Sequence, residues 1–323
     1  MIQMVKKLLC LVSLAAGLAL VPELAAAQQP VHLLVGFPPG GTTDILARLV
    51  AQHLTEVTGK TIIVENRPGA SGNIAAGLAA KAAGDGNTLL FVPSSHATNA
   101  SLYSNLPFDT LKSFRGLGMV AATPYVLVVN PKEIKADTLP ELVSYLKEHP
   151  GAVEFASAGP GTGQHLAGEL FKMQAKVDIM HVPYKGSSAA WPDLLAGRVP
   201  MMFDNIAVIM PLIKKGSLRP LAITSLSRSK FLSNVPTVAE SGFPGFEVLG
   251  WFALLAPAST PDKVVQEFST ALGKIETDPK FVSSLARIGA EPFVRSPKQT
   301  DDFLAQEVAK WRVVIRKAHI SLN

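Results

Sequence analysis

The chain has 323 residues, of which 30 are Lys or Arg and 25 are Asp or Glu, giving a formal charge of +5. With 48% apolar and 17% charged residues it is not a disordered, charge-dominated polypeptide, and it can bury one large core or two medium ones. Its single cysteine, Cys10, excludes an intramolecular disulfide and a cysteine-cluster metal site. Basic residues are dispersed and only 7% of residues are aromatic, so we expect no nucleic-acid partner.

The first 27 residues have the organisation of a secretory signal peptide. Lys6 and Lys7 precede an apolar stretch, residues 8–21, that is too short to span a bilayer, and three alanines end at Ala27. These features predict cleavage after Ala27, function in the periplasm and a mature chain without Cys10. A membrane anchor or a buried core helix is the alternative interpretation of the same stretch.

After this segment, short apolar runs alternate with helical patterns. The first three expected strands are residues 32–37, 61–65 and 88–92. Between them we expect helices over residues 45–57, where apolar residues recur on one face, and over the Ala-rich residues 73–83.

The middle of the chain repeats this alternation. Further strands are expected at residues 125–129, 153–156, 179–182, 201–203 and 221–224. Thr138 and Glu141 have the spacing of a capping box that opens a helix. The last third is expected to be mostly helical, with helix starts at Pro261, Pro279 and Pro297.

This alternation predicts α/β architecture, with mainly parallel sheets flanked by helices. At this length two lobes are expected rather than one oversized domain, joined by short crossings in strand-like backbone. The expected organisation is a signal peptide (residues 1–27), a discontinuous first lobe (28–124 plus 224–323) and a second lobe (125–223).

The first candidate binding loop joins a strand to a helix. Its glycines let the backbone approach a ligand closely, and the first helical turn that follows presents unsatisfied N–H groups at a positive dipole end. A carboxylate or phosphate suits such a site, whereas the alternative is a tight structural turn. The candidate residues are Pro38, Gly40, Gly41, Thr42, Thr43 and Asp44.

A second loop has the same design in the other expected lobe. Its Gly-x-Gly-x-Gly sequence lacks the dinucleotide-binding spacing, and Pro160 removes one amide donor, so no nucleotide cofactor is expected. We expect the two loops to hold one anion between them. The candidate residues here are Ser157, Gly159, Gly161, Thr162 and His165.

Polar residues follow three further strands, and ligands of open α/β sheets collect at the carboxyl ends of strands. Taken singly, each of these residues could also belong to an ordinary surface loop or helix cap. The candidates are Ser94, His96, Asn99, Tyr184, Lys185, Gly186 and Asp204.

Catalytic and metal sites have weaker support. A hydrolytic triad could combine Ser94 or Ser95, His96 or His165, and Asp204, but the chain has no Gly-x-Ser-x-Gly elbow. The remaining metal-like spacing, His165 with Glu169, lacks a third clustered ligand, so no metal is expected.

From about residue 30 onward the chain resembles the Bug-type receptors, the extracytoplasmic solute-binding proteins of tripartite tricarboxylate transporters. The stretches that carry the resemblance are VGFPPGGTTDILARLVA, VENRPGASGNIAA, AAGDGNTLLF, SSHATNASLY, ASAGPGTGQHLAGELF, HVPYKGSSAAWPDLLAGRV, MMFDN, RPLAITSLSRS and VPTVAESGFPGFEVLGWFALLAPASTP. Together they cover nearly the whole chain after the signal.

The resemblance implies a clamshell fold of the periplasmic-binding-protein type, with a small carboxylate held between the lobes largely by backbone amides of the two glycine-rich loops. It also implies delivery to membrane transporter subunits, no enzymatic activity, no cofactor and a monomeric state. Gly163 departs from the family, which usually has a hydroxyl residue there. An exported esterase-like hydrolase and a ligand-presenting sensory protein are the alternative functions.

Overall fold

The computed structural model describes residues 29–184 and 187–320. The expected signal peptide, residues 1–27, lies outside the described residues, as do two candidate site residues, Lys185 and Gly186. None of the described helices is long and apolar enough to cross a membrane.

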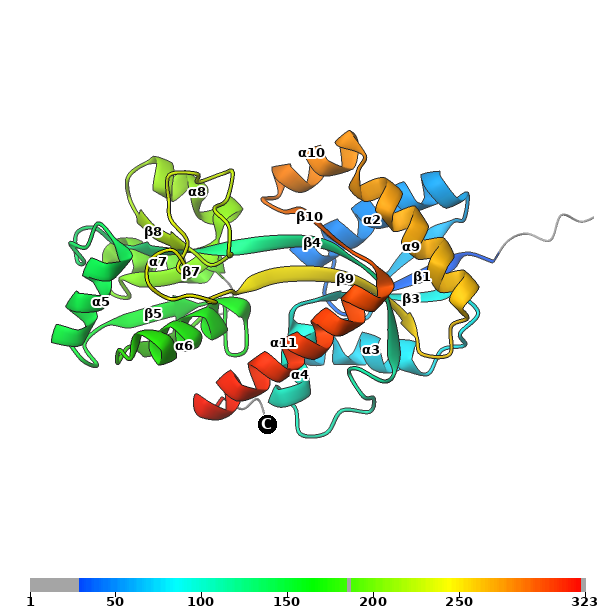
Figure 1. Ribbon diagram of the computed structural model, residues 1–323, viewed down its shortest axis with the longest axis horizontal. Helices are drawn as coiled ribbons and strands as arrows, with labels where there is room; N and C mark the ends of the chain where they lie inside the picture. The colour runs from blue at the N-terminus through cyan, green and yellow to red at the C-terminus, as the bar shows by residue number, and fades with distance from the viewer. Residues whose placement is uncertain (1–28, 185–186, 321–323) are drawn as a thin grey trace, which may run out of the picture.

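Ten strands and ten α-helices alternate along most of the described chain (Figure 1). The strands are β1 (Val31–Val35), β2 (Ile62–Asn66), β3 (Thr88–Pro93), β4 (Phe114–Val129), β5 (Glu154–Ser157), β6 (Met180–Pro183), β7 (Met201–Asn205), β8 (Arg219–Ile223), β9 (Leu249–Pro257) and β10 (Glu291–Arg295). The helices are α2 (Thr42–Thr58), α3 (Asn73–Ala80), α4 (Ser95–Leu102), α5 (Leu139–Glu148), α6 (Gly163–Ala175), α7 (Ser187–Ala196), α8 (Ile206–Lys214), α9 (Asp262–Glu276), α10 (Pro279–Arg287) and α11 (Pro297–Lys317), with a short 3-10 turn, η1 (Ala70–Gly72).

The strands form two lobes that share β4. Their order is β2-β1-β3-β9-β4-β7-β5-β6, and β8 and β10 each pair with β4 as well. Residues 114–124 of β4 pair with β9 in the larger lobe, whereas residues 125–129 pair with β7 and β8 in the smaller one. Figure 1 shows the long strands β4 and β9 running between the two lobes. The predicted two-lobed α/β fold is therefore confirmed.

The expectation of mainly parallel sheets holds only for the outer strands. β1 pairs in parallel with β2 and β3, and β5 does so with β6 and β7. The crossing strands β4 and β9 instead run antiparallel to each other and to all their other neighbours. The sheets are mixed because a strand that enters one lobe and a strand that returns from it lie side by side.

Helices cover both faces of each sheet, as the continuous apolar strand sequences predict. In the larger lobe, α2, α9 and α10 bury one face and α3 and α11 bury the other. In the smaller lobe, α5 and α6 bury one face and α7 and α8 the other. Each lobe thus has three layers with an apolar core on either side of its sheet.

Two segments extend the smaller lobe's core beyond its own strands. After β8, the chain packs Val235 on one side of that core and Val238, Phe246 and Val248 on the other. The last turns of α11 add Trp311 and its neighbours, although the helix begins on the larger lobe. Helix α11 therefore spans the junction of the lobes (Figure 1).

The helix starts expected in the last third are confirmed. Asp278 and Ser296 cap α10 and α11 through their side chains, and α9 begins directly after Pro261. Thr138 likewise accepts a hydrogen bond from the Glu141 N–H. β9 and β10 are not among the expected elements, and β4 begins earlier than expected, at Phe114.

Candidate functional site

The buried carboxylate of Asp44 fixes the first glycine-rich loop through hydrogen bonds. The carboxylate accepts hydrogen bonds from the Gly40 N–H at 2.9 Å, from Arg48 Nε at 3.0 Å and from Asn66 Nδ2 at 2.8 Å. Burial raises the pKa of Asp44, but these hydrogen bonds and the charge of Arg48 outweigh burial and lower it to about 2. Asp44 is therefore an ionised anchor of the loop.

The partners of Asp44 come from distant positions. Asn66 lies at the end of β2 and also donates to the Phe37 carbonyl oxygen at 2.9 Å, which fixes the start of the loop. Arg48 lies one turn further along α2. The link between Asn66 and Asp44 depends on the pairing of β1 with β2, so it had no signal in the sequence.

With Asp44 satisfied from within, the rest of the loop faces outward. Pro38, Gly40, Gly41 and Thr42 are exposed, whereas Thr43 is buried. Gly40 has φ +83°, a left-handed conformation that favours glycine, and a side chain there would meet no other atom within 4 Å. The first-turn amides of α2 have no partner among the described residues, as expected at a helix N-terminus.

The candidates that follow β3 have structural partners. His96 is buried against Phe108 and Phe114, and burial lowers its pKa to about 4. Asn99 is buried and donates to the Ser71 carbonyl oxygen at 3.0 Å and to Asn73 Oδ1 at 2.8 Å. These two side chains hold neighbouring segments together, whereas Ser94 is half-buried at the start of α4.

The turn around Ser71 is a part of this edge that is absent from the candidate list. Ser71 has φ +54°, which is unusual for a residue with a side chain, and Ser95 and Asn99 both donate to its carbonyl oxygen. Ser71, Ser95 and His96 line a recess of about 10 Å³ at the ends of β1 and β3, room for about one water molecule. The Ser71 signal in the sequence was its position between two glycines.

The second glycine-rich loop is closed by its own hydroxyl groups. Ser157 Oγ accepts from the Gly159 N–H at 3.0 Å, and Thr162 Oγ1 donates to the Gly159 carbonyl oxygen at 2.7 Å. Thr162 also caps α6 by accepting from the His165 N–H. Gly159 and Gly161 have φ +130° and +74°, so both glycines are required by the backbone.

Two histidines lie behind this loop. Gly161 N–H donates to His165 Nδ1 at 3.0 Å, and Ser157 Oγ lies 2.6 Å from His181 Nε2. The two imidazole rings stack on each other with centroids 3.7 Å apart. His165 thus contacts the loop's backbone, and His181, which the candidate list omits, contacts Ser157.

The remaining candidates of the smaller lobe join this network. Asp204 is fully buried and accepts from Ser187 Oγ, Trp191 Nε1, Gln164 Nε2 and the Asn205 N–H. Burial raises the pKa of the Asp204 carboxyl, although its four donors act in the opposite direction. Asp204 therefore ties β7 to the starts of α6 and α7.

Tyr184 connects the loop after β6 to the second glycine-rich loop. Its N–H donates to the Ser157 carbonyl oxygen at 3.0 Å, and its hydroxyl donates to Asp193 at 2.6 Å. Burial and the Asp193 carboxylate raise the pKa of Tyr184 to about 12. Lys185 and Gly186 follow it but lie outside the described residues.

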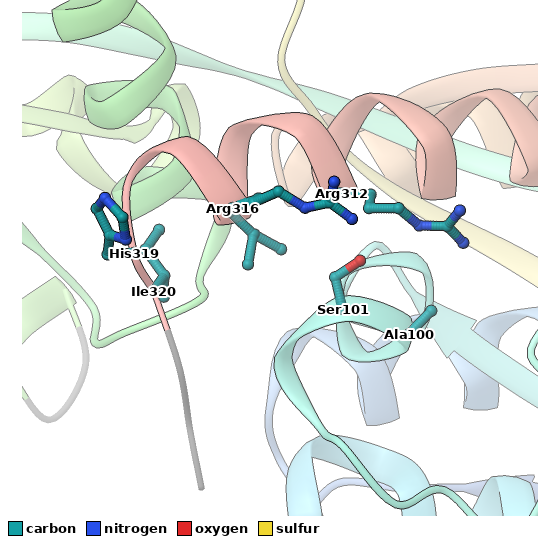
Figure 2. Close-up of a pocket in the computed structure, with 7 residues that line it drawn as sticks. Ala100, Ser101, Arg312, Arg316, His319 and Ile320 are labelled. Carbon is teal, nitrogen blue, oxygen red and sulfur yellow. The ribbon is translucent and has the colours of Figure 1, made fainter.

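The candidates therefore fall into two groups, one in each lobe. The first surrounds Asp44 and Asn99, the second surrounds Ser157 and Asp204, and no hydrogen bond between described residues joins them. A cavity of about 490 Å³ lies elsewhere, between α4 and the end of α11, and is lined by Ser101, Arg312, Arg316 and His319 among others (Figure 2). None of the candidate residues lines that cavity.

The described residues include no cluster of three His, Cys, Asp or Glu side chains able to hold a metal ion. His165 Nε2 lies 3.7 Å from Glu169 Oε1 without a third ligand nearby. What the two loops offer instead is a set of backbone N–H groups at two helix starts, which suits an anion rather than a metal or a reacting bond.

Two α/β lobes joined by crossing strands, each with a glycine-rich loop that opens a helix, define a two-lobed solute-binding protein. The model of the tripartite tricarboxylate transporter family receptor matches residues 46–320. The chain belongs to that family. It is accordingly a solute-binding receptor and not an enzyme, so the hydrolase alternative is wrong.

Relatives cover nearly the whole chain. BugT of Bordetella pertussis is 38% identical over 297 residues, which are 91% of each chain. A structure of Rpa4515 of R. palustris with adipate is 37% identical, with a TM-score of 0.77, and covers 92% of this chain and 100% of the other. MatC of Rhodopseudomonas palustris, solved with bound malate, is 29% identical, with a TM-score of 0.72, and covers 90% and 99%.

Proposed function

We propose that this chain captures a small carboxylate between its two lobes in the periplasm and delivers it to the membrane subunits of a tripartite tricarboxylate transporter. Solved relatives with adipate and with malate support a carboxylate ligand. The family model, which describes receptors of such transporters, supports the delivery step.

One observation carries the proposal: the starts of α2 and α6 are both left free to bind an anion. The polar side chains next to each loop have partners within the protein: Asp44 accepts from Gly40, Arg48 and Asn66. In the other lobe, Ser157 and Thr162 both bond to Gly159. The first-turn N–H groups of α2, and those of Gly163 and Gln164 in α6, keep their donor capacity for a ligand. Charge-assisted bonds from such donors to a carboxylate are strong.

Binding between lobes favours closure, because only a ligand that touches both loops has a higher affinity for the closed state. We place the larger lobe at residues 29–124 and 249–320 and the smaller at residues 125–248. The change of β4 partners at residue 125 supports the first crossing. The packing of Val238 and Phe246 on the smaller lobe's core supports a second crossing at residue 248, later than the sequence suggested.

The periplasmic location and a monomeric state are parts of the same proposal. The charged start, the short apolar stretch and the alanines before residue 28 support export by a cleaved signal. A monomer fits because each lobe supplies one of the two loops, so a single chain holds the complete pair.

The proposal is tested by thermal unfolding with adipate and malate, extended to a library of other carboxylates. A ligand at about 100 times its dissociation constant stabilises the folded state by about 2.7 kcal/mol, which raises the unfolding temperature by several degrees. Gly40→Val, in the first loop, should abolish this shift, because its side chain would project where the ligand approaches.

Gly245→Val is the matched control. Gly245 has φ +78°, close to the +83° of Gly40, and a side chain there would likewise meet no atom within 4 Å. Both variants therefore carry the same backbone strain, but only Gly40→Val should lose the ligand-induced shift. An equal shift in both variants would show that the first loop does not bind the ligand.

A further inference from the structure

The stacked histidines behind the second loop have a defined hydrogen-bonding arrangement. His165, on α6, is only 5% exposed, and its ring lies 11° from parallel to that of His181, on β6. Because an amide N–H can only donate, the bond from Gly161 requires an unprotonated Nδ1 on His165. The proton of the neutral His165 ring is therefore on Nε2.

His181 is fixed by the same loop. Its Nε2 lies 2.6 Å from the Ser157 hydroxyl, which in turn accepts from the Gly159 N–H. Burial, helped by the neighbouring His165, lowers the pKa of His181 to about 4, although Glu169 acts in the opposite direction. His181 therefore stays neutral well below neutral pH and keeps its contact with Ser157.

The charged groups around His165 come from each element packed on α6. Its own helix supplies Glu169, whose Oε1 lies 3.7 Å from His165 Nε2, and β6 supplies His181. β7 supplies Asp204, which is occupied by its four donors, and β5 supplies only uncharged groups here, Ser157 and Phe155. Lys317 and His319, at the end of α11, are further charged or titratable residues. They line one cavity together with Glu169 and Lys172 of α6.

We propose that His165 is a positioning residue that makes ligand capture depend on pH, with the loop in its binding form only while Nδ1 of His165 is unprotonated. The inference rests on the proposed function of the loop and adds a regulation to it. Protonation of Nδ1 would turn an acceptor into a donor that faces the donor N–H of Gly161.

The consequence for the ligand follows from the position of Gly161. This residue has φ +74° and immediately precedes the cap of α6, so the bond to His165 helps set the direction of the first-turn amides. Loss of that bond leaves the left-handed turn without its side-chain support. Affinity is therefore full while Nδ1 of His165 is unprotonated and falls when Nδ1 takes up a proton.

The test compares ligand affinity between about pH 8 and about pH 5, the interval in which histidine side chains ordinarily titrate. The probes are adipate and malate, measured by titration calorimetry with the full chain. In His165→Asn the amide oxygen replaces Nδ1 as the acceptor of the Gly161 N–H but does not titrate. We expect acidification to weaken binding about tenfold more in the wild type than in His165→Asn.

Two further variants separate this role from a general effect. His165→Leu removes the acceptor and should bind weakly at every pH, whereas His165→Asn keeps an acceptor and should bind more tightly than His165→Leu at pH 8. His149→Asn changes an exposed histidine of the same lobe and should keep the wild-type pH profile. The ligand's own titration is common to all four proteins and cancels in their ratios.

The outcomes distinguish the two proposals. Binding whose pH dependence is the same in wild type and His165→Asn would overturn the inference and leave the proposed function standing. Failure of every carboxylate to bind at any pH would overturn the proposed function and the inference with it.

A second measurement needs no ligand. In the NMR spectrum of the ligand-free protein, the Gly161 amide resonance should shift with pH in the wild type and not in His165→Asn. A Gly161 resonance that does not shift with pH in the wild type would contradict the inference independently of any ligand.

Discussion

Single residues in this receptor serve mainly to shape backbone, and Asp44 is the clearest case. The sequence suggested Asp44 as a binding residue, and the structure shows it accepting bonds from Gly40, Arg48 and Asn66. The loops could be predicted from glycines after strands, because that signal is local. The residues that hold them could not, since Asn66 and His181 reach the loops only through strand pairing.

Replacing the Asp44 carboxylate should reveal its contribution to stability. In Asp44→Asn the amide cannot accept from all three donors, and we expect the free energy of unfolding to fall by about 2 kcal/mol at pH 7. Because the folded-state pKa, about 2, lies below the ordinary value of 3.8, this contribution is present above pH 3.8 and is lost as the pH falls toward 2. Urea unfolding at pH 7 and at about pH 3 measures both effects.

Glu56→Gln provides the control for Asp44→Asn, because Glu56 is an exposed acid on the same helix. It should change stability by less than about 0.5 kcal/mol at either pH. A difference between wild type and Asp44→Asn that stays constant down to pH 2 would contradict the assignment of an ionised anchor.

At the scale of elements, glycines in β4 obscure the strand in the sequence. A side chain at Gly116 would collide with Thr300 of α11, and one at Gly118 would collide with Leu272 of α9. Both positions therefore require glycine if these helices are to pack closely on the strand. Glycine is otherwise typical of turns and weak strands, and the first half of β4 therefore gave no strand signal. The outer strands were predictable because their apolar runs depend on no such contact.

The start of α6 packs on β4 in a similar way. A side chain at Gly163 would fall on the hydroxyl and ring of Tyr125. Gly163→Ala should lower the free energy of unfolding by about 1–3 kcal/mol, because the buried ring must shift. In a Tyr125→Ala background this penalty should vanish, which urea unfolding of all four proteins measures as a double-mutant cycle.

A glycine with free space around it provides the control for Gly163→Ala. Gly273 lies within α9 with nothing close to the place of a side chain, so Gly273→Ala should stabilise the protein by up to about 1 kcal/mol. An equal penalty for Gly163→Ala with and without Tyr125 would contradict the proposed collision.

At the scale of the molecule, the lobes meet around Thr224. Its buried hydroxyl accepts from the Tyr125 N–H at 2.8 Å and donates to the Val248 carbonyl oxygen at 2.6 Å, which joins the entry of β4 into the smaller lobe to the segment that precedes β9. The two crossings that we propose, near residues 125 and 248, thus share one hydrogen-bonding residue.

Thr224→Val keeps the shape of this side chain and removes its hydroxyl. We expect a loss of about 1–3 kcal/mol in the free energy of unfolding, because the Tyr125 N–H is left buried without a partner. Thr224→Ser keeps the hydroxyl and should recover most of that loss. Urea unfolding of both variants checks this, and equal destabilisation by Val and Ser would assign the effect to packing instead.

The position of β9 has a consequence for when the protein can fold. β9 lies between β3 and β4, with Leu90 beside Leu255, so the larger lobe's sheet cannot form until late residues have been synthesised. Contacts between positions so distant in the chain form slowly. A nascent chain therefore stays without the central strand of its larger lobe for most of its synthesis, which would keep it unfolded for the export that we propose.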